Sequence, residues 1–178
     1  MILVPLGITG ATNAFNMLAG FNGLEVGLGI ICMITVSIIA YITNAMTALI
    51  ISLSCLGVLL ATIYYNWYPA KVLVGDVGTL CMGTVLAVTV IVGNFETAGV
   101  VLIIPFLIEF IFKAIHRFPS EGWWGIYKDG KLYCPENKIV SIPQLIMKIS
   151  GGIKETHLVI TLLTAEAIFG IITVLLYL

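Results

Sequence analysis

Long apolar segments alternate with short polar ones along almost the whole chain. Stretches of about 20 residues, enough to cross a bilayer as a helix, lie at residues 25–43, 45–65, 78–94, 97–115 and 157–178. The opening run, from Met1 to about Thr12, is too short to cross and is interpreted as the last half of another helix. The pattern predicts an all-α, polytopic membrane helix bundle with five complete transmembrane helices and the end of a sixth. We therefore expect the chain to be a fragment.

Composition supports a membrane protein. Of 178 residues, 60% are hydrophobic and 10% charged, and the mean hydropathy is +1.14, outside the usual range of soluble domains. The net charge of −1 gives no indication of a nucleic-acid partner, and we expect none. Cys32, Cys55 and Cys81 lie in apolar runs, where they are interpreted as small buried hydrophobic residues. With Cys134 they form no paired motif, so neither a disulfide framework nor a zinc site is predicted.

Positive charge lies on one side of the predicted bundle. When sides are assigned by alternation through the five spans, the turns near 43–45 and 94–97 carry no Lys or Arg. All eight fall on or next to the opposite side: Lys71, Lys113, Arg117, Lys128, Lys131, Lys138, Lys148 and Lys154. By the positive-inside rule this side is cytoplasmic.

The segment 116–156 is the one sizeable polar piece and is predicted to form a cytoplasmic loop subdomain. Lys128-Asp129-Gly130 predicts a small hairpin, since Asp-Gly supplies the positive φ angles of a tight turn. Trp123-Trp124 belongs to the hairpin's flank or marks the water–lipid interface. Ser141-Ile142-Pro143 then predicts the start of a short helix along the membrane, ended by Gly151-Gly152.

A cluster of carboxamides near the start of the chain is the first candidate site. Asn13, Asn16 and Asn22 lie between two apolar runs, where an unpaired amide costs several kcal/mol. Asn13, Asn16 and Gly20 have the spacing of one helix face. Gly20 and Gly23 would let the backbone turn and approach a ligand closely.

A second candidate is Asp76, which stands between glycines at the start of an apolar helix on the same side. One interpretation is a simple helix cap, because a helix N-terminus favours negative charge. The other follows from the nearby carboxamides: oxygen ligands with few basic neighbours suit Mg²⁺, completed by water and substrate phosphate.

Several charged residues need an explanation in a membrane setting. Lys71 and Lys113 are interpreted as interfacial residues that extend to water, whereas His116-Arg117, at a helix exit, could hold a phosphate. Glu155 and His157 are expected to form an interfacial pair. Two acids within spans, Glu109 and Glu166, are expected to face the bundle. From the residues alone, a transporter and a lipid-phosphate enzyme both fit.

Three motifs carry a family resemblance. The stretch Asn13–Glu25, the run Asn-Trp-Tyr-Pro…Val-Gly-Asp at 66–76, and His116-Arg117-Phe118-Pro119 occur in order. This chain thereby resembles the polyprenyl-phosphate N-acetylhexosamine-1-phosphate transferases, closest to the eukaryotic and archaeal UDP-GlcNAc–dolichyl-phosphate GlcNAc-1-phosphotransferases. Bacterial relatives usually carry Asp-Gly where this chain has Ala19-Gly20. The resemblance covers residues 1–178 and corresponds to the C-terminal half of a member.

The resemblance implies roles for individual residues. Asn16 and Asp76 correspond to the ligands of Mg²⁺, with Mn²⁺ as an alternative, and Asn22 to a uridine contact. His116 and Arg117 correspond to contacts with the diphosphate and sugar, and the glycines at 20 and 23 let the loop pass close to the nucleotide. The implied reaction transfers GlcNAc-1-phosphate from UDP-GlcNAc to polyprenyl (dolichyl) phosphate, releasing UMP, as the first step of lipid-linked glycan assembly such as protein N-glycosylation.

Two departures from the family pattern stand out. Leu73 replaces an aromatic residue that can stack on uracil. The family's adjacent catalytic aspartates belong to the N-terminal half, so no catalytic residue is assigned in this chain and we expect it to be inactive alone. An N-terminal-half polypeptide is then an expected partner, and relatives also suggest a homodimer. The implied location is the cell membrane of a prokaryote or the endoplasmic reticulum membrane of a eukaryote.

Two alternatives to an enzyme remain at this stage. A non-catalytic membrane subunit would keep the nucleotide-binding face and need an N-terminal partner. A transporter would rely on Glu109 and Glu166, but no internal repeat supports it.

Overall fold

Helices form almost all of the molecule. The computed structural model describes residues 3–118, 122, 124–135 and 139–178. Met1, Pro119, Trp123 and Lys138, which take part in the predictions above, lie outside these residues. In chain order the elements are α1 (Leu3–Met17), α2 (Leu24–Ile42), α3 (Met46–Asn66), α4 (Gly75–Val92), α5 (Glu96–Leu102), α6 (Ile104–Ile115), β1 (Ile126–Lys128), β2 (Lys131–Tyr133), α7 (Ile142–Ile149) and α8 (Glu155–Leu175).

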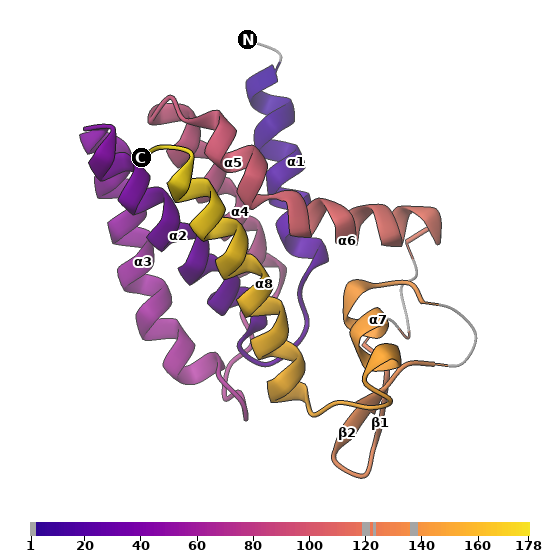
Figure 1. Cartoon of the computed structure of the whole chain (residues 1–178). Helices are drawn as coiled ribbons and strands as arrows, with labels where there is room; N and C mark the ends of the chain where they lie inside the picture. The colour runs from indigo at the N-terminus through magenta and orange to yellow at the C-terminus, as the bar shows by residue number, and fades with distance from the viewer. Residues whose placement is uncertain (1–2, 119–121, 123, 136–138) are drawn as a thin grey trace.

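The long helices pack side by side, and a small subdomain lies next to one side of this bundle. In Figure 1, α6 extends out of the bundle, and α7 with the hairpin lies below it. The two chain ends lie at one end of the bundle, and the hairpin lies toward the other. We call the end that carries the α1–α2 and α3–α4 loops the polar end.

Four helices are long and apolar enough to cross a membrane: α2, α3, α4 and α8. They match four of the five predicted spans to within three residues at each end. The first helix, α1, has 15 residues and continues five residues past its predicted end at Thr12. The predicted all-α membrane bundle is therefore confirmed.

The predicted span 97–115 is not one straight helix. It is divided at Ile103 into α5 and α6, which are bent by 52°. Pro105 lies in the first turn of α6, where its missing N–H costs nothing, whereas inside a continuous helix its ring would clash with the preceding turn. Together, α5 and α6 make up a fifth span only if a helix that is broken in the middle is counted as one span.

Helix α2 is the centre of the bundle, since it packs against α3, α4 and α8. Leu28, Met33 and Val36 are fully buried on it. A polar contact crosses the apolar interior between α2 and α3, where the Ser37 hydroxyl donates to the Ser52 hydroxyl at 2.8 Å. The core is therefore continuous from one side of the bundle to the other.

Helices α1 and α4 approach closely at a glycine. A Cβ at Gly83 would lie 2.7 Å from the Cα of Thr12, so no side chain fits between the backbones. Nearby, the Thr12 and Thr84 hydroxyls are hydrogen-bonded at 3.0 Å. The rings of Phe15 and Phe106 stack with centroids 4.6 Å apart and connect α1 to α6. This packing sets where the C-terminal end of α1 lies.

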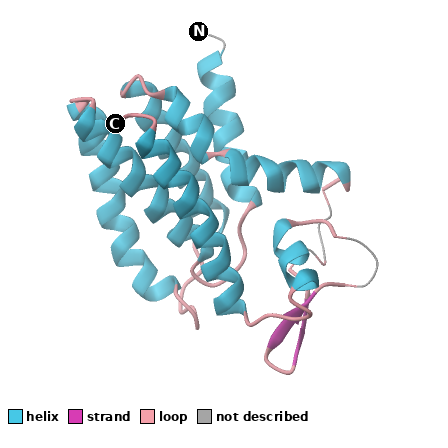
Figure 2. Cartoon of the chain, viewed as in Figure 1, coloured by secondary structure: helices cyan, strands magenta, loops and turns pink. Residues whose placement is uncertain are grey.

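The subdomain predicted from the polar segment is confirmed. Its two strands pair in antiparallel register from Ile126↔Tyr133 to Lys128↔Lys131, and Figure 2 shows strands only there among the described residues. Asp129 and Gly130 have φ angles of 49° and 77°, as the tight turn requires. The Ser141 side chain caps α7 by accepting from the Gln144 N–H at 3.2 Å, as its sequence predicts.

Two further predictions concern individual buried residues. Glu109 and Glu166 are 1% and 0% exposed, so both face the interior as predicted. Cys32 is buried, but Cys81 is exposed, so its interpretation as a buried residue is wrong.

Candidate functional site

Three segments distant in sequence meet at the polar end: the loop 18–23, the loop 67–74 and the start of α8. Asn22 connects all three. Its backbone N–H and its side-chain Nδ2 both donate to Glu155 Oε1, at 2.8 and 2.6 Å. Its Oδ1 accepts from the Ala70 N–H at 3.1 Å. The candidate nucleotide loop is therefore held in place by hydrogen bonds from α8 and from the loop that leads to Asp76.

Asn16 is hydrogen-bonded to the first turns of α4, the helix whose first turn carries Asp76. The Thr79 hydroxyl lies 2.5 Å from Asn16 Oδ1 and 3.1 Å from the backbone oxygen of Asp76. Thr79 is 1% exposed, so its hydrogen bond to Asn16 is shielded from water, whereas Asn16 itself is half-buried and Asp76 is exposed. The sequence analysis did not single out Thr79, because a threonine one turn into an apolar helix is unremarkable without its partner on α1.

Asp76 lies inside the first turn of α4, and the cap position belongs to Val74. Its interpretation as a simple helix cap is therefore wrong. Asp76 is exposed, and its charge is still favoured by the N-terminal end of the helix dipole. An exposed carboxylate in the first turn of a helix has open access for an external cation.

The residues present fit a hydrated Mg²⁺ ion. Asn16 and Asp76 supply an amide oxygen and a carboxylate, the type and number of protein ligands that Mg²⁺ commonly takes when phosphate and water complete its shell. A Cβ on the neighbouring Gly75 would meet nothing within 4 Å, so the approach is open. Among the described residues no group of three or more His, Cys, Asp or Glu could hold a metal.

The glycines of the first loop serve its own packing. Gly20 has a φ of 101° and Gly23 a φ of 83°, so the predicted turn is confirmed. Gly20 lies beyond the end of α1, so it does not share a helix face with Asn13 and Asn16 as predicted. At Gly23, a Cβ would lie 2.6 Å from the Trp67 ring. The close approach that Gly23 permits is thus to this ring.

Glu25 holds the same loop from α2. Its Oε1 accepts from the Gly20 N–H at 2.6 Å, and the residue is 5% exposed. Two carboxylates, Glu25 and Glu155, thus accept backbone N–H groups of one six-residue loop. The expected pairing of Glu155 with His157 is wrong: Glu155 points to Asn22, because two N–H donors there are better partners than an adjacent imidazole at the surface.

His116 and Arg117 are not brought to the Asn16–Asp76 junction by any hydrogen bond of the described residues. The His116 ring bonds the Phe112 backbone oxygen at 2.8 Å, within its own helix. Arg117 is exposed, with a φ of 58°. Both stand at the end of α6, which leads away from the bundle (Figure 1).

Lys113 and Glu109 form a buried ion pair at 3.2 Å on α6. The Lys113 ammonium also donates to the backbone oxygen of Met17, the last residue of α1. Glu109 Oε2 accepts from the Ile142 N–H at 2.6 Å, at the start of α7. The interpretation of Lys113 as a side chain extending to water is therefore wrong, because it compensates the negative end of α1 instead. The pair connects the subdomain to the residue beside the candidate metal site.

The loop 67–74 presents its outer residues to solvent. Leu73 is 68% exposed, and Lys71 lies over the Tyr64 ring, with its Nζ 5.7 Å from the ring centroid. Leu73 occupies the position where the family resemblance leads one to expect an aromatic residue, so stacking on uracil would need another group.

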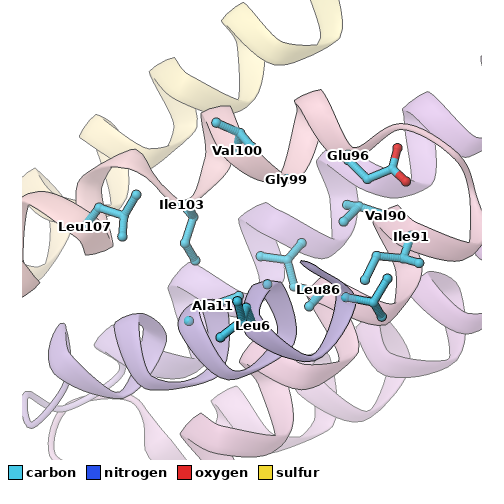
Figure 3. Close-up of a pocket in the computed structure, with 14 residues that line it drawn as sticks. Leu6, Ala11, Leu86, Val90, Ile91, Glu96, Gly99, Val100, Ile103 and Leu107 are labelled. Carbon is cyan, nitrogen blue, oxygen red and sulfur yellow. The ribbon is translucent and has the colours of Figure 1, made fainter. Parts of the chain in front are cut away.

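A groove of about 500 Å³ lies away from this junction, among α1, α4, α5 and α6. Figure 3 shows its lining, with Leu6 and Ala11 on one side and Val100 and Ile103 on the other. Glu96 is the one charged residue in this lining. The groove is apolar and has none of the candidate site residues.

Comparison with known proteins identifies the family. The model of glycosyl transferase family 4 matches residues 1–94, the half of the chain that contains both candidate metal ligands. The chain belongs to glycosyl transferase family 4. This membership confirms the resemblance inferred from the three motifs.

The similar proteins come from archaea and bacteria. One, from Saccharolobus solfataricus, is provisionally named a UDP-N-acetylglucosamine–dolichyl-phosphate N-acetylglucosaminephosphotransferase. It is 40% identical over 99% of this chain and 55% of its own length. A probable undecaprenyl-phosphate N-acetylglucosaminyl 1-phosphate transferase of Bacillus subtilis is 32% identical over 60% of this chain and 30% of its own length. The chain spans about half the length of the archaeal relative.

Proposed function

We propose that this membrane protein takes part in the transfer of GlcNAc-1-phosphate from UDP-GlcNAc to a polyprenyl phosphate of the dolichyl type, and that it provides the nucleotide and metal part of the site. The junction between α1 and α4 carries this proposal, because it puts an amide oxygen and an exposed carboxylate next to a helix N-terminus. Family membership and the names of the relatives support the substrate class.

Different residues of the chain would bind the metal ion, the diphosphate and the uridine. Asn16 and Asp76 would hold Mg²⁺, and the Thr79 hydroxyl, which donates to Asn16 Oδ1, would fix the orientation of that amide. The ion, when bound, neutralises charge on the diphosphate. The free N–H groups at the start of α4 favour the same anionic groups. Asn22 would contact the uridine from the loop that Glu155 holds.

The reaction balances without further reactants. An oxygen of the lipid phosphate attacks the β-phosphorus of UDP-GlcNAc, the bond from that phosphorus to the bridging oxygen breaks, and UMP leaves with the electron pair. Positioning and charge stabilisation are the protein's contribution. We assign the polar end to the cytoplasmic side, since exposed Lys71, Lys128 and Lys154 lie on loops or on the hairpin there or beside it, and the opposite turns have no Lys or Arg.

The decisive experiment measures UDP-GlcNAc binding to the purified chain in detergent, with Mg²⁺ and with EDTA. Binding should be tighter with Mg²⁺, and Asp76→Asn should lose this metal-dependent part. Glu96→Gln is the matched control, since it makes the same change of acid to amide in the apolar groove. Equal binding with and without metal, or an unchanged metal response in Asp76→Asn, would contradict the metal assignment.

A further inference from the structure

Asn22 is the only side chain among the described residues that hydrogen-bonds both Glu155 and Ala70. A carboxamide has two orientations that differ by exchange of oxygen and nitrogen, and its surroundings select between them. At Asn22 the two hydrogen-bond partners allow only one of these orientations. A carboxylate oxygen only accepts and a backbone N–H only donates, so Nδ2 must face Glu155 and Oδ1 must face Ala70.

The flipped orientation would be doubly unfavourable. It would place Oδ1 against the Glu155 carboxylate and Nδ2 against the Ala70 N–H, losing two hydrogen bonds and opposing like partial charges. Hydrogen bonds to charged groups are among the stronger ones in proteins. The remaining Nδ2 proton and Oδ1 lone pair of Asn22 therefore have fixed places.

A fixed donor and acceptor can distinguish two pyrimidines of the same shape. Uracil presents an N3 donor beside an O4 acceptor, whereas cytosine presents an N3 acceptor beside an N4 donor. An amide that could flip would pair with either edge. An amide held in one orientation pairs well with one edge and opposes the other.

We propose that Glu155 is a positioning residue for nucleotide specificity, which fixes the Asn22 amide so that the site accepts a uracil base and rejects cytosine. This inference rests on the proposed function, since it takes Asn22 as the base contact. Glu155 touches neither the metal ligands nor the reacting phosphates in this assignment. Its effect should appear in the choice of base and not in the metal dependence.

The test compares UDP and CDP binding, with Mg²⁺, for the full chain in detergent. The unmodified chain should bind UDP more tightly than CDP. Glu155→Gln places an amide beside Asn22 that can donate as well as accept, so the ratio of the two affinities should fall about tenfold. Glu96→Gln should keep the original ratio.

The outcomes distinguish a failure of this inference from a failure of the proposed function on which it rests. If Glu155→Gln weakens the binding of UDP and of CDP by the same factor, Glu155 only holds the loop and the specificity role is wrong. If the unmodified chain binds UDP and CDP equally, the orientation argument fails but a nucleotide site remains. If it binds neither nucleotide, the proposed function and this inference both fail.

Discussion

The contact between α1 and α4 predicts that a single methyl group added at Gly83 disturbs the candidate metal site one helical turn away. In Gly83→Ala the new Cβ would lie 2.7 Å from the Cα of Thr12 and 3.0 Å from the backbone oxygen of Ala11. Both are backbone atoms, so no side-chain rotation relieves the clash. The two helices must separate.

The size of the separation follows from the same contact. Reaching 3.4 Å, where ordinary van der Waals contact begins, requires a shift of at least about 0.7 Å. Thr12 and Asn16 lie one turn apart on α1, and Thr79 lies one turn before Gly83 on α4. A shift of that size would lengthen the 2.5 Å bond between Thr79 and Asn16 to about 3.2 Å, beyond the usual O–H···O range.

Two measurements follow for Gly83→Ala. Thermal unfolding in detergent should show a loss of about 1–3 kcal/mol, typical of overpacking, and Mn²⁺ affinity by electron paramagnetic resonance should fall. Gly57→Ala is the control, because a Cβ there meets nothing within 4 Å; it should leave Mn²⁺ affinity unchanged and should not lower stability, since alanine is the better helix former. A Gly83→Ala protein with unchanged stability and unchanged Mn²⁺ affinity would refute the close packing and its link to the site.

Two other predictions test the polar end. Gly23→Ala should destabilise the protein by about 1–3 kcal/mol in thermal unfolding, because alanine is strained at a φ of 83° and its Cβ meets the Trp67 ring; adding Trp67→Ala should recover part of this loss, and no recovery would contradict the clash. Thr79→Val should lower Mn²⁺ affinity about 10-fold to 100-fold by releasing Asn16. Thr84→Val removes a comparable bond between the same helices and should leave that affinity unchanged; equal losses in both variants would show a general effect of helix packing.

Local pattern was enough for most of the elements, though not for the break between α5 and α6, and for the choice of candidate residues. The length of each apolar run predicts a span because the bilayer sets that length. Asp129-Gly130 predicts the hairpin turn because few residues adopt its positive φ angles. Asn16 and Asp76 stand out because polar groups at the edge of apolar helices need a partner. Each of these signals lies within a few residues along the chain.

Contacts between distant segments were decided only by the tertiary structure. Asn22 and Glu155 are 133 positions apart, and the pairing of Thr79 with Asn16 spans 63. Nothing near Glu155 or Thr79 in the sequence indicates these partners, since each resembles an ordinary residue of a helix start. Where they point depends on how α8 and α4 pack against the helices around them. The candidate residues could therefore be chosen from the sequence, whereas the orientation of their amides could not, because packing between helices sets it.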